Sequence, residues 1–555
     1  MLLALFLAIQ IQAQTQNARV TGQVISLAGA PLKKATVRLQ GLSQGPSSPP
    51  TNYSATSDGG GKFLFEDVVP GKYVLIAQRA GYISQQFGAK TPGGAGSQVS
   101  LDTGQELKDL VLTMTPQAMI FGKVVDEDGE PLSGYLIWSS RWSFVNGKRQ
   151  MQGTGNGTSQ ADGTFVLGSL RSGLYYLSAE NRSNLNSFGV ERAGTKAPQE
   201  SYLKTYFPNA LDATSAAAID VAEGAEVRGI EMHVRRGRVF EVRGRIDSGP
   251  SAPKFAGLAM IPKGASGNFT DQRQTQIQGK EGVFQFKNVP PGTYILQTQY
   301  AQLEAKDPTG EFTKTTPLVA RIEVTVADQN IENLVVPLSP GMEIRGSIKT
   351  EGADPTSANG AKDQPWVYLR NTEPSINGGN NSAQIENDGT FRLGGIVPGV
   401  YRVSVNLFAG NTYVKGVKFG GQDVNGKDLD LTASSGGEMQ IVLSANGAEL
   451  SGTVRDADGK AVPSAAVQIC DKAGEVAKTA NADQNGAFDL KGLAPGEYKV
   501  FAWEDRGDGI ISDPEFRKAF ESKSTEVKLS EGSHGNVEPV MFTKAAMDLE
   551  AAKVR

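Results

Sequence analysis

The chain alternates short apolar runs with polar turns, and one arrangement of these runs occurs five times. Its last copy, Asp483 to Trp503, reads DQNGAFDLKGLAPGEYKVFAW, and related stretches begin at Asp58, Asp162, Glu281 and Asp388. In every copy a phenylalanine precedes a tyrosine by ten residues, with a glycine two residues before the tyrosine. The five pairs are Phe63 and Tyr73, Phe165 and Tyr175, Phe284 and Tyr294, Phe391 and Tyr401, and Phe488 and Tyr498. Such fixed spacing indicates a structural repeat.

The spacing within each copy predicts two strands joined by a tight turn. Residues two apart point to the same face of a strand, so Phe488 aligns with Leu490, and Tyr498 aligns with Val500. The Pro-Gly pair between them is typical of a tight turn, and the Asn-Gly pair before the phenylalanine is a hairpin signal. A tyrosine can bury its ring and still use its hydroxyl in a hydrogen bond, which suits a strand corner. We therefore expect the ten aromatic residues of the repeat to be structural and buried.

A glycine-containing apolar run precedes each copy, and a polar hairpin follows it. The preceding runs read VTGQV, IFGKVV, VRGRI, IRGSI and LSGTV, and each glycine lies 36 to 45 residues before its phenylalanine. Each unit therefore holds roughly 100 residues in six to eight short strands, with no convincing helix, which is the pattern of a β-sandwich. The sequence predicts an all-β chain of five tandem sandwiches.

Few residues separate the last strand of one unit from the first strand of the next. Because no Ser/Pro or Gly/Ser tract intervenes, we expect short and fairly stiff joints. Units of roughly 30 Å each then predict an extended array on the order of 150 Å. The expected segments are a signal-peptide-like stretch at 1–16, sandwiches at 17–116, 117–236, 237–340, 341–446 and 447–543, and a C-terminal tail at 544–555.

These repeats resemble the carboxypeptidase regulatory-like domain. The resemblance rests on the early G-x-V with its G-x-P-L, then D-G-x-F, then P-G-x-Y. It is clear in units 1, 2, 4 and 5 and weaker in unit 3, which has Glu281 and no early G-x-P. The resemblance implies a transthyretin-like or immunoglobulin-like Greek-key sandwich within the carbohydrate-binding-like fold grouping. It also implies a noncatalytic protein of the tandem, exported bacterial type.

Composition removes several classes of function. The net charge of the 555-residue chain is −4, so no strong field of one sign is available to attract nucleic acid. One cysteine, Cys470, excludes an intramolecular disulfide, and its strand-like setting favours a buried thiol. The two histidines, His233 and His534, form neither H-x-x-E nor H-E-x-x-H, and no G-x-S-x-G occurs. We predict a protein that is not an enzyme and uses no cofactor.

The first residues, MLLALFLAIQIQAQ, contain a short apolar run of the kind found in secretory signal peptides. The run is too short to span a membrane, and no later segment approaches about 20 apolar residues. We expect an exported chain of the periplasm, cell surface or extracellular space, without a membrane span in its mature form.

The acidic loop after Trp503 is the best candidate for a metal site. In EDRGDGIISDPE, the residues Glu504, Asp508 and Glu515 fall near the ligand positions of a calcium loop. Arg506 stands where an oxygen ligand belongs, and Pro514 disfavours a regular helix after the loop. A solvated acidic loop is therefore the favoured interpretation, and calcium binding stays open.

Unit 2 carries the candidate ligand site. The stretch GYLIWSSRWSFVNGKR places Trp138 and Trp142 close together, and the longest irregular loop adds Tyr202, Tyr206 and Phe207. Exposed rings can stack on the faces of sugars. The favoured alternative is that these rings pack in the core and clamp the loop onto the sandwich.

These observations lead to three functional hypotheses. The first is a noncatalytic exported binding or spacer protein of the cell envelope. The second is a carbohydrate-binding protein that uses the aromatic residues of unit 2, and the third is an accessory chain for a peptidase or other envelope enzyme. The expected partner is a polysaccharide or an envelope protein, and not a nucleic acid.

Overall fold

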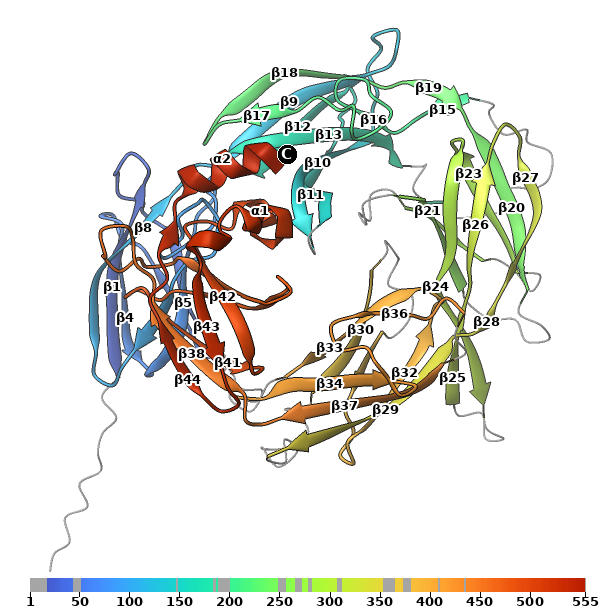
Figure 1. Cartoon of the computed structure of the whole chain (residues 1–555). Coiled ribbons are helices and arrows are strands. Elements are labelled where there is room, and N and C mark those ends of the chain that lie inside the picture. The colour runs from blue at the N-terminus through green and yellow to red at the C-terminus, as the bar shows by residue number, and fades with distance from the viewer. Residues whose placement is uncertain are drawn as a thin grey trace, which may run out of the picture.

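The computed structural model describes residues 17–42, 51–145, 148–182, 186–187, 200–247, 256–264, 272–277, 282–306, 312–352, 365–372, 381–407, 410–433 and 436–554. Most of these residues lie in short strands, which form five successive β-sandwiches (Figure 1). The predicted all-β fold of tandem sandwiches is confirmed.

Sandwiches 1 and 2 have the same plan, in which a three-stranded sheet packs on a larger one. Sandwich 1 contains β1 (Ala18–Ser26), β2 (Thr36–Gly41), β3 (Asn52–Thr56), β4 (Lys62–Val68), β5 (Gly71–Gln78), β6 (Gln85–Gln86), β7 (Gln98–Leu101) and β8 (Glu106–Met114). Sandwich 2 contains β9 (Ala118–Val125), β10 (Tyr135–Val145), β11 (Lys148–Thr158), β12 (Thr164–Leu170), β13 (Gly173–Asn181), β16 (Thr205–Tyr206), β17 (Ile219–Val221) and β18 (Glu226–His233). The small sheets run β4-β1-β8 and β12-β9-β18.

Sandwiches 3 and 4 follow, with short strands at their joints. Sandwich 3 contains β20 (Phe240–Asp247), β21 (Ala256–Pro262), β22 (Arg273–Gln276), β23 (Val283–Val289), β24 (Gly292–Lys306), β25 (Phe312–Val319), β26 (Arg321–Val326) and β27 (Ile331–Pro337). Sandwich 4 contains β29 (Met342–Glu351), β30 (Trp366–Asn371), β31 (Ser382–Gln384), β32 (Thr390–Ile396), β33 (Val400–Asn406), β34 (Tyr413–Phe419), β35 (Gln422–Asp423), β36 (Asp428–Asp430) and β37 (Gly437–Ser444). The joint strands are β14 (Asn186–Ser187), β15 (Glu200–Tyr202), β19 (Arg236–Arg238) and β28 (Ser339–Pro340).

Sandwich 5 adds helices to the same plan. Its strands are β38 (Ala448–Thr453), β39 (Ala466–Asp471), β40 (Val476–Asn481), β41 (Ala487–Leu493), β42 (Gly496–Trp503), β43 (Thr525–Leu529), β44 (His534–Val537) and β45 (Met541–Phe542). Its helices are η4 (Gly507–Ser512), α1 (Pro514–Lys518), η5 (Glu521–Lys523) and α2 (Lys544–Val554).

Each core depends on a glycine that lies beneath a phenylalanine ring. The glycine of the first strand stands directly opposite the repeat phenylalanine on the antiparallel neighbour. On its other side the first strand pairs in parallel with β8, β18, β27, β37 or β44. The pairs are Gly22 and Phe63, Gly122 and Phe165, Gly244 and Phe284, Gly346 and Phe391, and Gly452 and Phe488. A methyl group on Gly244 would lie 2.7 Å from the Phe284 ring. The ring therefore covers backbone that any larger residue would keep away.

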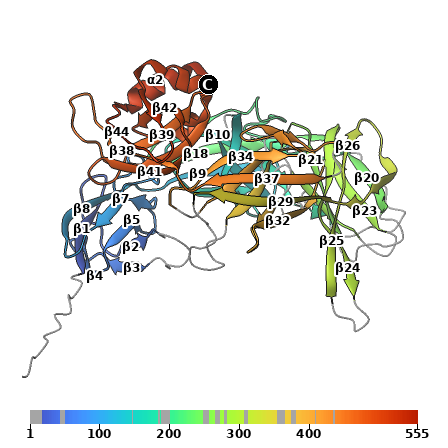
Figure 2. The ribbon, with the colours of Figure 1, turned by 60° about the horizontal axis from the view of Figure 1, so that its bottom comes forward.

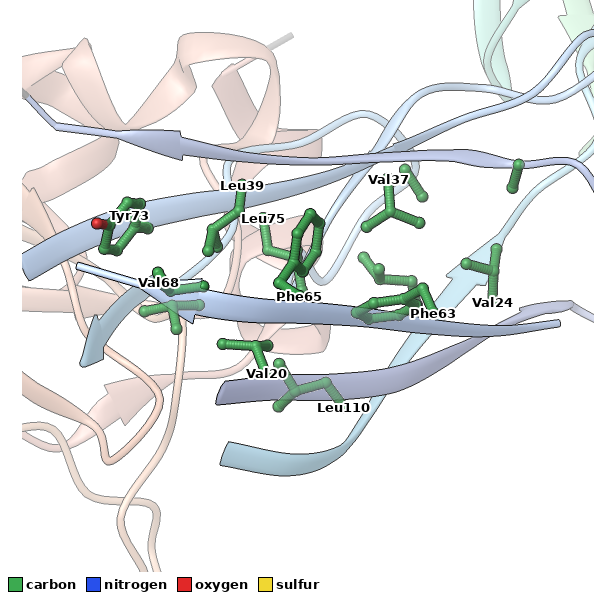
Figure 3. Packing of buried hydrophobic residues seen from close by; sticks show 14 of the residues in the cluster. Val20, Val24, Val37, Leu39, Phe63, Phe65, Val68, Tyr73, Leu75 and Leu110 are labelled. Carbon is green, nitrogen blue, oxygen red and sulfur yellow. The ribbon is translucent and has the colours of Figure 1, made fainter. Parts of the chain in front are cut away.

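The ten repeat aromatics are buried, as predicted. Phe63 is 4% exposed and Tyr73 is 3% exposed, and the other four pairs are between 1% and 6% exposed. Figure 3 shows Phe63 and Phe65 lying between the two sheets of sandwich 1, with Val20 and Leu110 on one side and Leu75 on the other.

Each repeat tyrosine closes the corner of its strand with its hydroxyl. In four sandwiches the hydroxyl donates to the carbonyl oxygen four residues earlier, on Val69, Pro290, Val397 and Ala494, at 2.5, 2.8, 2.6 and 2.7 Å. In sandwich 2 the Tyr175 hydroxyl instead accepts the backbone N–H of Arg171 at 3.0 Å. The tyrosine thus satisfies a backbone group at the turn while its ring stays in the core.

The array is curved and closes on itself, which corrects the expected extended arrangement. Figures 1 and 2 show sandwich 5 beside sandwich 1. The Asn481 amide donates to the Gly96 carbonyl oxygen at 3.2 Å, and the Gln484 side chain bonds both backbone groups of Ser100 at 3.3 and 3.2 Å. A short joint does not fix the direction of a bend, and here the array curves until its first and last sandwiches meet.

A second aromatic cluster covers the outer face of the large sheet of sandwich 5. Trp503 is fully buried there, stacked on Phe501 at 5.4 Å and edge-on to Phe520 at 5.1 Å. Its indole N–H donates to Oε1 of Gln468 at 3.2 Å. Phe144 of sandwich 2 packs on this cluster, so sandwich 5 contacts sandwich 2 as well as sandwich 1.

The helices that cover this cluster were not predicted, and the expectation of no helix was wrong. Pro514 is the first residue of α1, where its missing N–H costs nothing, and the Asp513 side chain accepts the N–H of Glu515 at 2.9 Å. The Asp-Pro pair is thus a helix start. The expected C-terminal tail forms α2, and its Met547 and Ala551 are buried in the cluster. Cys470 lies in the same cluster, where burial raises the pKa of its thiol to about 11.

Changing Gly122 to alanine tests the glycine–phenylalanine packing. The added methyl carbon would lie 2.7 Å from both the Ile230 carbonyl oxygen and a Phe165 ring carbon. We expect Gly122→Ala to lower the free energy of unfolding of sandwich 2 by about 1–3 kcal/mol, measured by chemical denaturation. Gly153→Ala is the matched control, because nothing lies within 4 Å of its added methyl carbon. Equal stability of the two variants would contradict this packing role.

Closure of the array can be tested by a cross-link. The hydroxyls of Ser97 and Ser464 are in contact although the two residues are 367 positions apart. We expect the double variant Ser97→Cys, Ser464→Cys to form an intramolecular disulfide under mild oxidation, seen as faster migration on a non-reducing gel. The control pair Ser97→Cys, Ser451→Cys should stay reduced because Ser451 lies on the other sheet of sandwich 5. Closure would be contradicted if the Ser97→Cys, Ser464→Cys variant stayed reduced and small-angle scattering of the native chain showed a rod-shaped particle.

Candidate functional site

The large sheet of sandwich 2 presents aromatic side chains on the face that points away from its core. On β10, Tyr135 and Ile137 are buried in the core, so the alternate residues Trp138 and Trp142 lie on the opposite face. The strands run in the order β11-β10-β13-β16. Ser178 of β13 stands opposite Trp138 on one side and opposite Tyr206 on the other. Trp138, Trp142 and Tyr206 therefore share one sheet face.

Trp142 has the surroundings of a ring held at a surface. It is partly exposed, meets Tyr176 edge to face at 6.3 Å, and is covered on one side by the Arg149 guanidinium at 4.7 Å. Trp138 is more enclosed, because its indole N–H is buried and has no acceptor. The Lys204 ammonium lies 5.4 Å from the centre of the Tyr206 ring. Two cations, Arg149 and Lys204, thus lie against aromatic rings on this face. Such a mixture of charged and apolar groups is typical of surfaces that contact ligands.

Tyr202 and Phe207 lie elsewhere and pack against the core of sandwich 2. Tyr202 meets Tyr135 edge to face at 6.3 Å, and its hydroxyl donates to Asp126 at 2.9 Å. Arg236 donates to the same hydroxyl at 2.7 Å and covers the ring at 4.9 Å. The structure thus divides the five predicted aromatics between a sheet face and a clamp that holds the loop.

The clamp has a defined charge state. Burial opposes ionisation of Asp126, but the N–H groups of Glu130 and Asp128, the Tyr202 hydroxyl and the Arg236 charge together lower the pKa of its carboxyl. Asp126 therefore stabilises the fold as a carboxylate at neutral pH, and this contribution is lost as the pH falls through its lowered pKa.

Sandwich 4 carries a second aromatic pair that the sequence analysis missed. On β30, Val367 and Leu369 are in the core, so Trp366 and Tyr368 lie on the opposite face. Their rings stack at 6.3 Å with an interplanar angle of 26°, and both side chains are partly exposed. The sequence WVYLRN does indicate this placement. Its aromatic residues alternate with the buried Val367 and Leu369, so they occupy the positions that point away from the core.

Both aromatic faces belong to sheets on the inner side of the curved array. Figure 1 shows the sheets of β10 and β13 and of β30 and β33 nearer its middle, with the sheets of β9 and β29 outside. Since the aromatic side chains point away from the cores, they face inward. The molecule therefore presents at least two aromatic surfaces on one concave side.

The acidic loop of sandwich 5 is used for structure at both ends. Glu504 accepts the backbone N–H of Lys544 at 2.7 Å and so holds the start of α2, and Glu515 pairs with Lys518 at 2.6 Å. The Asp508 side chain lies outside the described residues. Among the residues that the structure describes, no group of three or more His, Cys, Asp or Glu side chains is placed to hold a metal ion.

Both histidines lie in strands, beside single carboxylates. His233 is 2.9 Å from Glu231 on β18, and His534 is 3.2 Å from Glu449. Within the described part of the chain, no helix combines the length and apolar character that crossing a bilayer requires.

Comparison with solved structures finds several remote matches. The minor pilin GBS52 of Streptococcus agalactiae aligns at 13% identity and a TM-score of 0.21, over 40% of this chain and 97% of that one. The major pilin subunit BcpA of Bacillus cereus aligns at 10% identity and a TM-score of 0.16, over 58% and 99%. Two B repeat units of the collagen binding protein of Staphylococcus aureus align at 12% identity and a TM-score of 0.12, over 77% and 99%. Such values carry no argument about function.

Comparison by sequence assigns two of the units to a family. No curated protein matches the chain. The family model of the carboxypeptidase regulatory-like domain matches residues 19–115 and 449–537, which are sandwiches 1 and 5. The glycine, phenylalanine and tyrosine that organise these two sandwiches recur at the same structural positions in the other three. The chain is thus a tandem β-sandwich protein in which sandwiches 1 and 5 match the carboxypeptidase regulatory-like domain.

Proposed function

We propose that this chain is a noncatalytic exported binding protein of the cell envelope that holds polysaccharide on its inner aromatic faces. The observation that carries the proposal is the pair of partly exposed aromatic groups, Trp142 with Tyr176 and Trp366 with Tyr368, on inward-facing sheets of two sandwiches. Sequence export signals and the repeat architecture support the envelope location.

The chemistry of these faces suits sugars better than a purely apolar partner. A pyranose ring has an apolar face for stacking and hydroxyl groups for hydrogen bonds, and each aromatic pair stands among polar side chains. On sandwich 4, Asn406 and Ser404 stand opposite Trp366 and Tyr368 on the neighbouring strand. A sugar stacked on these rings would find donors and acceptors on the adjacent strand.

Two sites on one chain favour a polymer over a single sugar. Stacking on one ring pair is modest in strength, so each site alone should bind weakly. A polysaccharide that reaches both sites gains from effective concentration, because the second contact is intramolecular. The hydrogen bonds that join sandwiches 1 and 5 help to hold sandwiches 2 and 4 in fixed positions, which limits the entropy lost on binding.

The closed array also bears on the alternative functions. A spacer needs length, and contact between the first and last sandwiches shortens the particle. The accessory role for a peptidase or another enzyme would require a surface for a protein partner. The aromatic pairs favour the polysaccharide, and pull-down against envelope proteins tests the accessory role separately.

Removing one tryptophan from each face tests the proposal. We expect Trp142→Ala and Trp366→Ala each to weaken retention in affinity gels that contain polysaccharide, and the double variant to lose retention. Both rings are partly exposed, so the unfolding temperature should change by no more than about 2–4 °C. Phe121→Ala is the control, because Phe121 lies on the outer sheet of sandwich 2, beneath Arg228 at 4.1 Å. Unchanged retention by the double variant, across a panel that the native chain binds, would contradict the proposal.

The Tyr202 clamp predicts the opposite pattern. Tyr202→Phe removes the hydroxyl that Arg236 and Asp126 share, which leaves a buried carboxylate with one donor fewer. We expect the free energy of unfolding of sandwich 2 to fall by about 1–3 kcal/mol at neutral pH, measured by denaturant titration.

This loss should shrink as the medium is acidified through the lowered pKa of Asp126, because the carboxylate that the hydroxyl serves becomes protonated. Polysaccharide retention by the folded variant should stay at the native level. Loss of retention with full stability would instead place Tyr202 in the ligand site.

A further inference from the structure

A cleft with a cavity volume of about 760 Å³ lies at the joint between sandwiches 1 and 2. One wall comes from β2, β5 and the loop that follows β5, and the other comes from the turn between β12 and β13. Its size is in the range of sites that hold small organic ligands. None of the aromatic residues of the proposed polysaccharide faces lines it.

The charged side chains of this cleft are all positive. Lys34, Arg79 and Arg171 line it, and no carboxylate is among its lining residues. Within the described part of the chain, none of the three forms an ion pair, although several other surface cations do. The chain as a whole has a net charge of −4, so this group is a local reversal of its charge.

Two of the cations are held in place by their neighbours. The Arg79 guanidinium lies over the Tyr82 ring at 5.0 Å, which orients the group without neutralising it. The Arg171 guanidinium comes from sandwich 2 and packs against Gly93 of sandwich 1, where an added methyl carbon would be 2.7 Å away. The site is therefore assembled from both sandwiches, and the joint fixes the distance between its charges.

The other repeats show that the fold does not need these cations. Lys34 occupies a turn position with positive φ, where sandwich 2 has Gly134 and sandwich 5 has Ser464. Counted from the repeat tyrosine, the place of Arg171 is taken by Val69, Pro290, Val397 and Ala494 in the other units, and the place of Arg79 by Asn181, Tyr300, Leu407 and Glu504. A lysine in a left-handed backbone position is costlier than a glycine, so its presence is not explained by the turn itself.

A second joint cleft provides a contrast. The cavity of about 530 Å³ between sandwiches 3 and 4 is bordered by the matching turn, at Pro398 and Gly399. There the cation Lys263 is paired with Glu323 at 2.7 Å, and both residues line the cavity. Arg321 also lines this cavity, so the joint between sandwiches 3 and 4 holds two cations and one carboxylate, whereas the joint between sandwiches 1 and 2 holds three cations and no carboxylate.

We propose that the cleft between sandwiches 1 and 2 binds a small ligand, or a segment of a larger one, that bears two or more oxyanionic groups. Guanidinium groups recognise carboxylate and phosphate through paired N–H donors, and lysine adds a point charge. Gln78, Gln86 and Ser84 also line the cleft and can bond the uncharged oxygens of such a ligand. Carboxylate and phosphate share this chemistry, so the experiment must separate the two sources.

Calorimetric titration of the full chain with three probes tests the site. The probes are tri-galacturonic acid for carboxylates, inorganic tripolyphosphate for phosphates, and maltotriose as the neutral comparison. We expect one or both acids to bind with an affinity that falls as salt is raised, because screening weakens exposed charge pairs, and maltotriose not to bind the cleft. The acid that binds, or the tighter binder if both do, identifies the source of the oxyanion.

The variant Lys34→Ser, Arg79→Asn, Arg171→Val replaces each cation by a residue that another repeat carries at the same place. It should fold and should lose affinity for the acid by about tenfold or more, since charge-assisted hydrogen bonds are lost. Lys62→Ser, on the other sheet of sandwich 1, should leave the affinity unchanged. If the triple variant fails to fold, Arg79→Asn alone serves, with a smaller expected loss.

Three results would overturn the site: neither acid binds, the variants bind as tightly as the native chain, or Lys62→Ser weakens binding as much as the triple variant does. The double variant Trp142→Ala, Trp366→Ala should still bind the acid. Loss of polysaccharide retention by that variant, with acid binding intact, separates this inference from the proposed function. Failure of either one leaves the other standing.

Discussion

Five phenylalanine rings lie directly on the backbone of five glycines, and the rest of this molecule depends on that contact. The ring of Phe63 reaches across from β4 to cover Gly22 of β1, and the carbonyl of β8 borders the same spot from the parallel side. A side chain at the glycine would push the ring out of the space between the sheets. The contact therefore fixes the register of three strands at one point, because a shift by one residue would turn the ring to the outer face.

The tyrosine corner then ties the second sheet to the first. In sandwiches 1, 3, 4 and 5 the hydroxyl takes up the carbonyl oxygen at the start of the turn, so the turn can be buried without an unpaired acceptor. Sandwich 2 has Arg171 and Ser172 where each of the other sandwiches has an apolar residue followed by proline. There the Tyr175 hydroxyl accepts the backbone N–H of Arg171 instead of donating to a carbonyl oxygen. The departure leaves the corner closed and frees an arginine to reach the neighbouring sandwich.

The surfaces proposed to bind ligands depend on how the joints orient the sheets. The sheets that carry the repeat tyrosines lie on the inner side of the curve (Figure 1). Residues of these strands that point away from the core therefore face the concave side of the molecule. The aromatic groups of sandwiches 2 and 4 occupy this phase. The cationic cleft arises from the same geometry, since a turn of one sandwich is brought against a sheet edge of the previous one. The arrangement of the joints thus creates surfaces that no single sandwich has.

The hairpins expected around the repeat do not form, because β41 pairs with β38 and β42 pairs with β39. The number of sandwiches and the burial of Phe488 and Tyr498 in the last one could, by contrast, be predicted from the sequence. These features rest on local periodicity, which is written along one strand at a time. Two further features could have been predicted from the sequence but were not: the helix start at Asp513 and Pro514, and the position of Trp366 on the face of its strand that points away from the core. Three further features are visible only in the folded chain: Trp142 and Tyr202 lie apart, Trp503 is enclosed beneath α1 and α2, and Ser97 contacts Ser464. Each of these depends on the angle at joints or on packing between segments hundreds of residues apart, and neither quantity leaves a periodic signal in the chain.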